Sequence, residues 1–279
     1  MRLLVAEGNT LASRQQFAEI AGETPSEGYA RVLRRLAADA VVDICTPADA
    51  DAAVPQPLDS YDGVVVTGSA LNIYQREPAA LRQIEFLRGV FARGLPGLGS
   101  CWGLQLGCVA AGGDVERNPK GRELGFARRV TLTDSGRDHP MHAGRADVFD
   151  APAIHSDIVT RLPAGSLATA RNAMSEVQAA EIRVGDSVFW GVQYHPEYRL
   201  HDVAAVVRRH DASFVGEGFF ADMDDLDRYV ADLKALEGNA GRRDIAWRLD
   251  IGNEILDIGL REVEIVNWLA FVRQRSTTA

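Results

Sequence analysis

The sequence has little cysteine, with three in 279 residues, and the three form no Cys-x-x-Cys pair. This scarcity excludes a disulfide framework and fits a reducing, cytoplasmic compartment. No stretch approaches the roughly 18 consecutive apolar residues of a membrane-spanning helix. The first residues also lack the pattern of a signal peptide. We therefore expect a cytoplasmic protein with no membrane partner.

A basic surface and a nucleotide-binding loop are missing as well. The formal net charge is -9, and the arginines are interspersed with acids, so no nucleic-acid partner is expected. The chain has no Gly-x-x-x-x-Gly-Lys-[Ser/Thr] phosphate loop, and no motif implies a cofactor. Apolar residues make up 46% of the chain, which is ample for a globular core.

Short apolar runs alternate with helical patterns in the first part of the chain. The runs at 3–6, 41–45 and 63–67 predict buried strands, and 25–39 and 78–93 predict helices. This alternation predicts an α/β fold: an open, mostly parallel, flavodoxin-like sheet with helices on both faces. Residues 125–194 alternate in polarity and predict an added antiparallel region. We expect residues 1–200 to form one domain and 201–279 a helical extension packed on it.

Residues 99–105 (GSCWGLQ) are the stretch around which the chain is organised. Because 95–98 predicts a strand and 104–111 a helix, Cys101 falls on a sharp strand-to-helix turn, with a glycine two residues away on each side. This is the pattern of a nucleophile elbow. The N-terminus of a helix favours a thiolate, and the backbone N–H of Trp102 is free to stabilise an oxyanion.

A second motif at 192–197 (VQYHPE) supplies what a cysteine nucleophile needs. The nucleophile requires a base, and the base requires an acid that orients it. His195 and Glu197 are two residues apart, so on an extended segment their side chains share a face. The sequence therefore predicts a Cys-His-Glu triad of Cys101, His195 and Glu197.

With these two motifs the sequence resembles a class I glutamine amidotransferase domain, the Cys-His-Glu type found in GMP synthetase and its relatives. The family's Gly-x-Cys-x-Gly-x-Gln elbow matches 99–105, and its Gly-x-Gln-aromatic-His-Pro-Glu motif matches 191–197. Looser similarity extends over 118–125 and 153–159. The resemblance covers roughly residues 1 to 200.

The resemblance implies hydrolysis of the side-chain amide of L-glutamine through a cysteinyl thioester. It assigns the nucleophile to Cys101, the proton transfers to His195 and the orienting acid to Glu197. It also implies backbone oxyanion donors at Trp102 and at Gly68 or Ser69, although Thr67-Gly68-Ser69 departs from the family's common Gly-Gly-Pro. The substrate-contacting residues that it implies are Gln105, His155, Ser156 and Asp157.

Other residues have structural interpretations. Trp102 is expected to form a half-buried wall of the site. Cys45 and Cys108 are expected to be unreactive side chains in the core. His139 and His142 fall in a predicted surface turn with no further ligand nearby, so no metal site is expected. His201 and His210 are expected to be solvated on a charged helix.

Three functions stay open on the sequence. The first is a glutaminase that passes ammonia to a synthetase on another chain, since no synthetase motif is present here. The second is a free-standing γ-glutamyl amide hydrolase, which would need no partner. The third is a non-catalytic sensor on an inherited fold, which the intact triad disfavours. The sequence leaves the oligomeric state undetermined, and its C-terminal helices are consistent with packing, a lid or a dimer face.

Overall fold

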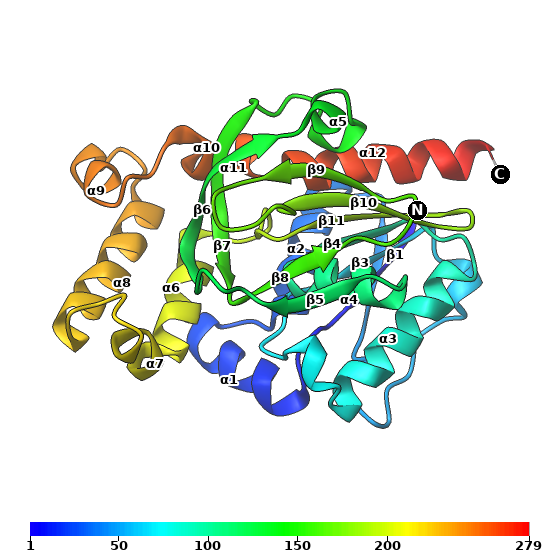
Figure 1. The fold of residues 1–279 in the computed structure, drawn as a ribbon, viewed down its shortest axis with the longest axis horizontal. Coiled ribbons are helices and arrows are strands. Elements are labelled where there is room, and N and C mark those ends of the chain that lie inside the picture. Colours follow the sequence, from blue (N-terminus) through cyan, green and yellow to red (C-terminus); the bar gives the residue numbers. More distant parts are fainter. Residues whose placement is uncertain (279) are drawn as a thin grey trace.

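A computed structural model describes residues 1–278 of the chain and contains one large sheet at its centre (Figure 1). Its nine strands lie in the order β2-β1-β3-β4-β11-β10-β9-β6-β7. The first five are parallel and the last four antiparallel. The strands are β1 (Arg2–Ala6), β2 (Val41–Cys45), β3 (Gly63–Val66), β4 (Gly97–Ser100), β6 (Glu123–Leu132), β7 (Val148–His155), β9 (Leu167–Arg171), β10 (Ala179–Val184) and β11 (Ser187–Val192).

This sheet confirms the predicted architecture. The order of its parallel part is that of a flavodoxin-like sheet, with β11 in the fifth place. The sequence did not predict a separate two-stranded sheet, formed by β5 (Asp114–Arg117) and β8 (Asp157–Arg161). Its strands are short and mostly polar, so the alternation that marks a strand is weak there.

Helices cover both faces of the large sheet. They are α1 (Leu11–Ala21), α2 (Pro25–Leu36), α3 (Pro78–Phe91), α4 (Trp102–Ala110), α5 (Asp134–Arg137), α6 (Leu200–Arg209), α7 (Asp211–Gly216), α8 (Met223–Gly238), α9 (Arg243–Arg248), α10 (Asn253–Leu256), α11 (Ile258–Arg261) and α12 (Val263–Thr278). None of the helices within 1–278 is long and apolar enough to cross a membrane.

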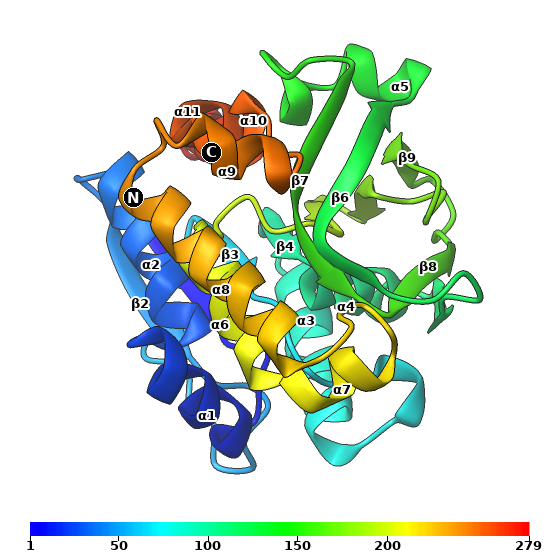
Figure 2. The ribbon, with the colours of Figure 1, turned by 90° about the vertical axis from the view of Figure 1, so that its left-hand side faces the viewer.

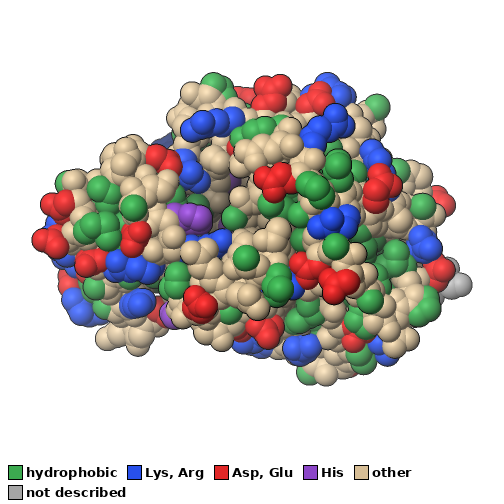
Figure 3. Space-filling view, turned by 90° about the horizontal axis from the view of Figure 1, so that it is seen from below, with side chains coloured by type: hydrophobic (Ala, Val, Ile, Leu, Met, Phe, Trp, Pro, Cys, Tyr) green, Lys and Arg blue, Asp and Glu red, His purple; other side chains and the backbone are tan. Residues whose placement is uncertain are grey.

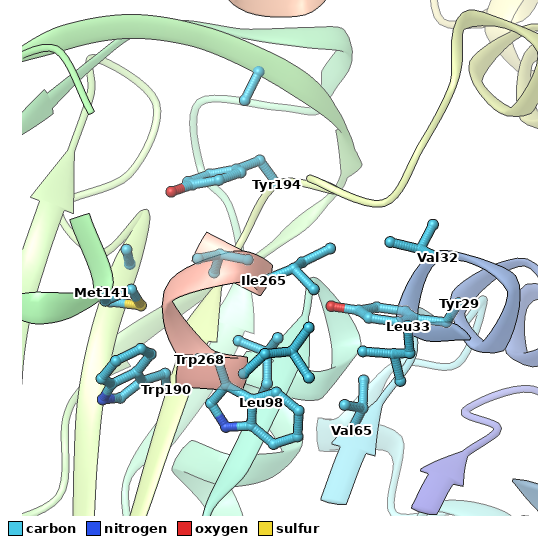
Figure 4. Close-up of a cluster of buried hydrophobic side chains, with 14 of the residues drawn as sticks. Tyr29, Val32, Leu33, Val65, Leu98, Met141, Trp190, Tyr194, Ile265 and Trp268 are labelled. Carbon is cyan, nitrogen blue, oxygen red and sulfur yellow. The ribbon is translucent and has the colours of Figure 1, made fainter. Parts of the chain in front are cut away.

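Successive residues of β1 point into two different cores, as the two-residue period of a strand requires. Leu3 and Val5 pack with side chains of α2 and α12, whereas Leu4 packs with side chains of α3 and α4. Figure 4 shows the first of these cores, where Tyr29 and Trp268 approach the sheet from two helices. The parallel strands are therefore buried on both faces, which explains their continuous apolar sequences.

The helices after residue 200 fall into two groups. Helices α6, α7, α8 and α9 form a core of their own together with Phe126 of β6, and Figure 2 shows α6 and α8 side by side. Helix α12 instead crosses the large sheet, where Trp268 and Val272 lie fully buried. Gly63 permits this close approach, because a Cβ there would lie 2.9 Å from the Trp268 ring.

Candidate active site

Cys101 occupies the turn between β4 and α4 in a strained conformation. Its φ is 53°, a region that non-glycine residues rarely adopt. The backbone N–H of Cys101 donates to the Val192 carbonyl oxygen at 2.7 Å, which ties the turn to the end of β11. Gly99 and Gly103 are required here, because a Cβ on Gly99 would lie 2.5 Å from the Gly103 backbone. The predicted sharp turn is therefore present, with Cys101 at the carboxyl edge of the sheet.

His195 and Glu197 lie in the loop that follows β11, not on the extended segment predicted from the sequence. The two are nevertheless joined, since His195 Nδ1 is 2.7 Å from Glu197 Oε1. Both side chains are buried. Burial lowers the pKa of His195, but the Glu197 carboxylate and hydrogen bonding with Cys101 outweigh it and raise this pKa to about 10. Because Glu197 occupies Nδ1, the interaction with the thiol falls to Nε2.

The imidazole of His195 is held on one face and at one edge. The Tyr198 ring stacks on one face, with ring centroids 3.9 Å apart and an angle of 11° between the planes. Gly68 lies against the ring as well, so close that a Cβ on it would be 2.7 Å from His195 Cε1. These contacts restrict the ring to one orientation, as a group that transfers protons requires.

A buried hydrogen-bond chain extends from Glu197 away from the thiol. Ser100 Oγ donates to Glu197 Oε2 at 2.9 Å, the oxygen that His195 does not use. Ser100 Oγ also lies 3.2 Å from the Tyr29 hydroxyl of α2. Both carboxylate oxygens of Glu197 are thus satisfied in a buried site, where an unsatisfied oxygen would be costly.

The loop at 67–70 is positioned by Asn9, which follows β1 at the same edge of the sheet. Asn9 Nδ2 donates to the Gly68 carbonyl oxygen at 3.2 Å, and Asn9 Oδ1 accepts from the Ala70 N–H at 3.0 Å. The Thr67 hydroxyl donates to the same Gly68 carbonyl at 3.0 Å. In a planar trans peptide the N–H points opposite to the carbonyl. The Ser69 N–H therefore points away from Asn9.

The residues expected to contact substrate lie together beside Cys101. Gln105, His155, Ser156 and Asp157 all line one cavity with it. Gln105 Nε2 donates to the Asp157 carbonyl oxygen at 3.1 Å. The Asp157 carboxylate accepts from Asn72 Nδ2 at 2.7 Å and from the Tyr74 hydroxyl at 3.3 Å. This carboxylate is buried and has no cation as a hydrogen-bond partner within the described part of the chain.

His155 differs from its neighbours, because both of its ring nitrogens are already engaged. Nε2 lies 2.8 Å from Glu123 Oε2 and Nδ1 lies 3.0 Å from the Asp157 carbonyl oxygen. Glu123 also accepts from Asn172 and Gln178. The ring thus joins β6 to the start of β8, where Asp157 lies.

The cavity around Cys101 has a volume of about 200 Å³, and its lining comprises two groups of side chains. One group is the polar side chains around Asp157, which we call the polar end. The other group, which we call the far end, comes mainly from α1 and the segment after His195: Phe17, Tyr198, Val206, Arg209, His210 and Phe214. Figure 3 shows histidine and basic side chains side by side where this face of the molecule is hollowed.

Several structural expectations need correction. Trp102 is fully buried rather than half-buried, and its Nε1 donates to Gln83 Oε1 at 2.9 Å. His139 and His142 are buried at 8% and 2% exposure, not in a surface turn, because Glu181 and Thr169 supply hydrogen-bond partners for their rings. His210 is also less solvated than expected, since it lines the cavity.

His201 is likewise only partly exposed, with Nε2 3.1 Å from the Ala21 carbonyl oxygen. Cys45 and Cys108 are buried, as predicted, and burial raises the pKa of each thiol to about 12. The described residues contain no group of three or more His, Cys, Asp or Glu side chains arranged to hold a metal ion.

Sequence reasoning missed Ser100, Asn9 and Tyr29. Ser100 stands inside the elbow motif, and its position beside the nucleophile was a usable signal. Asn9 follows the first strand, so the rule that sites lie at the carboxyl ends of parallel strands would have selected it. Tyr29 carried no such signal, because its spacing marked only the apolar face of a helix.

The chain is similar in sequence to proteins that hydrolyse glutamine or a γ-glutamyl amide. The family model described as "Glutamine amidotransferase class-I" matches residues 25–209. A γ-glutamyl-L-1-hydroxyisopropylamide hydrolase of a Pseudomonas species is 39% identical over 96% of this chain and 92% of its own length. A glutamine-hydrolysing GMP synthase of Nitrosomonas eutropha is 32% identical over 61% of this chain but only 32% of its own length.

Solved structures show the same fold at low sequence identity. A glutamine amidotransferase from Thermotoga maritima superposes with a TM-score of 0.61 at 18% identity, covering 88% of this chain and 97% of its own. One from Methylobacillus flagellatus superposes with a TM-score of 0.59 at 17% identity, covering 99% of this chain and 94% of its own. Because the match to the Methylobacillus flagellatus protein covers 99% of this chain, it includes the helices that follow residue 200.

Proposed function

The chain belongs to the class I glutamine amidotransferase family and is an amide-hydrolysing enzyme, and from this premise we propose that it is a free-standing hydrolase of γ-glutamyl amides of small amines. Its substrate would be an amide in which the γ-carboxyl of glutamate is joined to an organic amine. The products would be glutamate and the free amine.

The observation that carries this proposal is the far end of the cavity. A glutaminase needs room only for ammonia beyond its histidine. Here the lining of the cavity also includes Phe17, Val206 and Phe214. Such a wall of partly apolar side chains suits the carbon skeleton of an amine. The similarity to the Pseudomonas hydrolase, over nearly the whole of both chains, supports the same substrate class.

In the first half of the reaction, the Cys101 thiolate attacks the γ-carbonyl carbon of the amide. The carbon–nitrogen bond then breaks, and protonated His195 donates its Nε2 proton to the departing amine. The thioester between Cys101 and the glutamyl group remains. A pKa of about 10 for His195 keeps that proton available at neutral pH.

Two backbone N–H groups stabilise the negative charge that develops on the carbonyl oxygen. Trp102 N–H lies in the first turn of α4, where a helix provides no internal acceptor. Ser69 N–H is the second donor, because Asn9 and Thr67 hold the preceding carbonyl in the opposite direction. Gly68 is not one of these donors. It contributes by having no side chain, which leaves room for the His195 ring.

In the second half, neutral His195 takes a proton from water, which attacks the thioester and releases glutamate. Glu197 orients the imidazole through Nδ1 and stabilises its positive charge in both halves. Ser100 positions Glu197 in turn. The overall balance is one amide and one water consumed, with one glutamate and one amine formed.

The glutamyl group itself is recognised at the polar end of the cavity. Its α-ammonium group pairs with the buried carboxylate of Asp157, which already accepts hydrogen bonds from neutral Asn72 and Tyr74. Gln105 positions Asp157 by binding its backbone carbonyl. His155, whose ring nitrogens are both engaged, holds the start of β8 without contacting the substrate through them.

A second candidate is a glutaminase that supplies ammonia to a synthetase on another chain. The similarity to part of a GMP synthase supports it. In either case a nucleophilic thiol and three unpaired cysteines suit the reducing environment of the cytoplasm.

The test uses the purified chain without any partner. Glutamate release is measured from L-glutamine and from γ-glutamylethylamide, with Cys101→Ala as the control. We expect kcat/KM for the ethylamide to exceed that for glutamine by about tenfold or more, since each buried methylene contributes to discrimination. Turnover of glutamine alone would instead support the second candidate, and absence of turnover of both would contradict the hydrolase.

A further inference from the structure

Arg209 is a cationic side chain at the far end of the cavity with an incomplete set of partners. It ends α6 and lines the cavity with Cys101 and His195. Its Nη2 donates to Ser13 Oγ at 2.6 Å and its Nε to Gln16 Oε1 at 3.2 Å. Both partners are uncharged, and Nη1 has no protein acceptor within the described residues. The guanidinium is therefore held against α1, and it has N–H donors left that can bind another group.

The charges around Arg209 leave its own charge uncompensated at short range. No carboxylate among the described side chains lies within ion-pair distance of it, and burial lowers its pKa, although Tyr198 and Glu7 act in the opposite direction. Glu7 itself is buried and accepts hydrogen bonds from Asn9, Ser26 and Thr67. A partly buried arginine without a carboxylate is unusual enough to suggest that the partner comes from outside the chain.

Arg122 and His210 line the same cavity as Arg209, but only Arg122 is a second cation, because the pKa of His210 is lowered. Burial lowers the pKa of His210, and the charges of Arg209 and Arg122 lower it further, while Glu217 and Asp211 partly oppose them. Arg122 is already paired with Glu217 through two hydrogen bonds of 3.0 and 3.1 Å. Arg209 is therefore the cation of this group that is free to bind an anion.

We propose that Arg209 binds an anionic group, such as a carboxylate, on the amine portion of the substrate. The substrate class would then be γ-glutamyl derivatives of amino acids rather than of neutral amines. The uncompensated guanidinium among Phe17, Val206 and Phe214 carries this inference, because that end of the cavity combines an apolar wall with one fixed charge. Arginine also suits a carboxylate, since its fork offers two parallel donors.

This proposal rests on the proposed hydrolase function and narrows its substrate. The name of the Pseudomonas relative describes an uncharged amine portion, so the two proteins would differ in specificity. The position of Arg209 in the last turn of a helix suits the helix dipole. The dipole alone, however, does not account for a side chain that lines the cavity and is anchored to α1.

The experiment measures binding, so that it does not depend on turnover. The Cys101→Ala chain is titrated calorimetrically with γ-glutamylglycine and with γ-glutamylglycinamide, two ligands of nearly equal size that differ in one negative charge. We expect γ-glutamylglycine to bind about 10- to 100-fold more tightly, as a charged hydrogen bond implies. Adding Arg209→Gln should abolish that difference, and Arg209→Lys should retain part of it.

Arg208→Gln is the matched control. It removes a charge from the neighbouring residue of α6, whose partner is Asp227 at 2.6 Å, and should leave both affinities unchanged. Equal binding of the two ligands would overturn the anion site and leave the hydrolase proposal intact. An equal loss for both ligands in Arg209→Gln would also overturn it, because Arg209 would then bind the glutamyl portion. Failure of both ligands to bind would overturn both proposals.

Discussion

Two buried histidines that line the same cavity are each paired with a carboxylate, and the two pairs differ in one respect. His195 lies 2.7 Å from Glu197 and His155 lies 2.8 Å from Glu123. In the first pair only Nδ1 is engaged by protein oxygen, and the remaining nitrogen interacts with Cys101. In the second pair the remaining nitrogen lies 3.0 Å from the backbone carbonyl of Asp157. Of the two pairs, the first has the free nitrogen that the proposed proton transfer requires.

The difference shows that a histidine beside a carboxylate is not by itself a catalytic group. Its two hydrogen bonds make His155 a brace between β6 and the start of β8. His195 has one hydrogen bond to protein oxygen, which orients the ring and leaves a nitrogen for the base role that we propose. Variants of the two pairs should therefore fail in different ways, and substitutions in and beside the pairs test this.

The largest effect is expected for His195→Asn. It removes the group that transfers protons while leaving the size of the site nearly unchanged, and should lower kcat by about 10⁴-fold or more. Steady-state release of glutamate measures it, with thermal unfolding as a check that the protein is folded. A matched His155→Asn should retain most of the turnover rate. Comparable losses of kcat in the two variants would remove the distinction between the pairs.

Glu197→Gln should cost about 10³- to 10⁴-fold in kcat and also change the pH profile. The carboxylate, together with hydrogen bonding to Cys101, raises the pKa of His195 to about 10 against burial. Without the carboxylate this pKa is lower, so the alkaline limb of the kcat profile should move to lower pH. An unchanged alkaline limb would show that another group sets it.

The raised pKa of His195 also makes the stability of the protein depend on pH. Because the pKa of His195 is raised in the folded protein, its contribution is fully present below about pH 6.5 and is lost as the pH rises through about 10. The free energy of unfolding measured from pH 6 to 10 should therefore decline less steeply in Glu197→Gln than in the natural protein.

Ser100→Ala sharpens the comparison by removing the support of Glu197 and nothing that touches substrate. It leaves Glu197 Oε2 without its 2.9 Å hydrogen bond, so we expect kcat to fall about tenfold and the unfolding free energy by about 1–2 kcal/mol. Ser100→Thr, which keeps a hydroxyl, should recover part of the rate. A loss of stability with kcat unchanged would mean that Ser100 is purely structural.

Glu123→Gln should have the smallest effect on turnover. It weakens a hydrogen-bond network of His155, Asn172 and Gln178 and should lower stability by about 1–3 kcal/mol. We expect kcat to change less than about threefold and KM to rise, because the start of β8, which carries Asp157, loses its brace. Denaturant unfolding and steady-state kinetics measure the two effects separately. A large loss of kcat would place this pair in the chemistry.

Much of the site was predictable because it is encoded in contiguous sequence. The glycines of 99–105 permit the turn at Cys101, and His195 and Glu197 are too close in the chain to be far apart in space. The sequence failed where burial decides the outcome. Trp102 was expected at the surface of the site but is buried, because Gln83, on a different helix, receives its N–H.

The same limit applies to His139 and His142, which looked like a surface turn. Their partners Glu181 and Thr169 are about 30 to 40 residues away in the chain, so nothing local indicated that these histidines are paired and buried. An unpaired histidine in this position would face solvent, as the sequence suggested.

By itself the sequence predicted the main strands and helices, the sharp turn at Cys101 and the closeness of His195 to Glu197, because each depends on residues close together in the chain. Only the tertiary structure decided which histidine has a free nitrogen, how Ser100 and Asn9 support the site, and that Arg209 lines the cavity. Those relations join segments up to about 200 residues apart. A hydrogen bond or an uncompensated charge exists only once folding has brought its surroundings together.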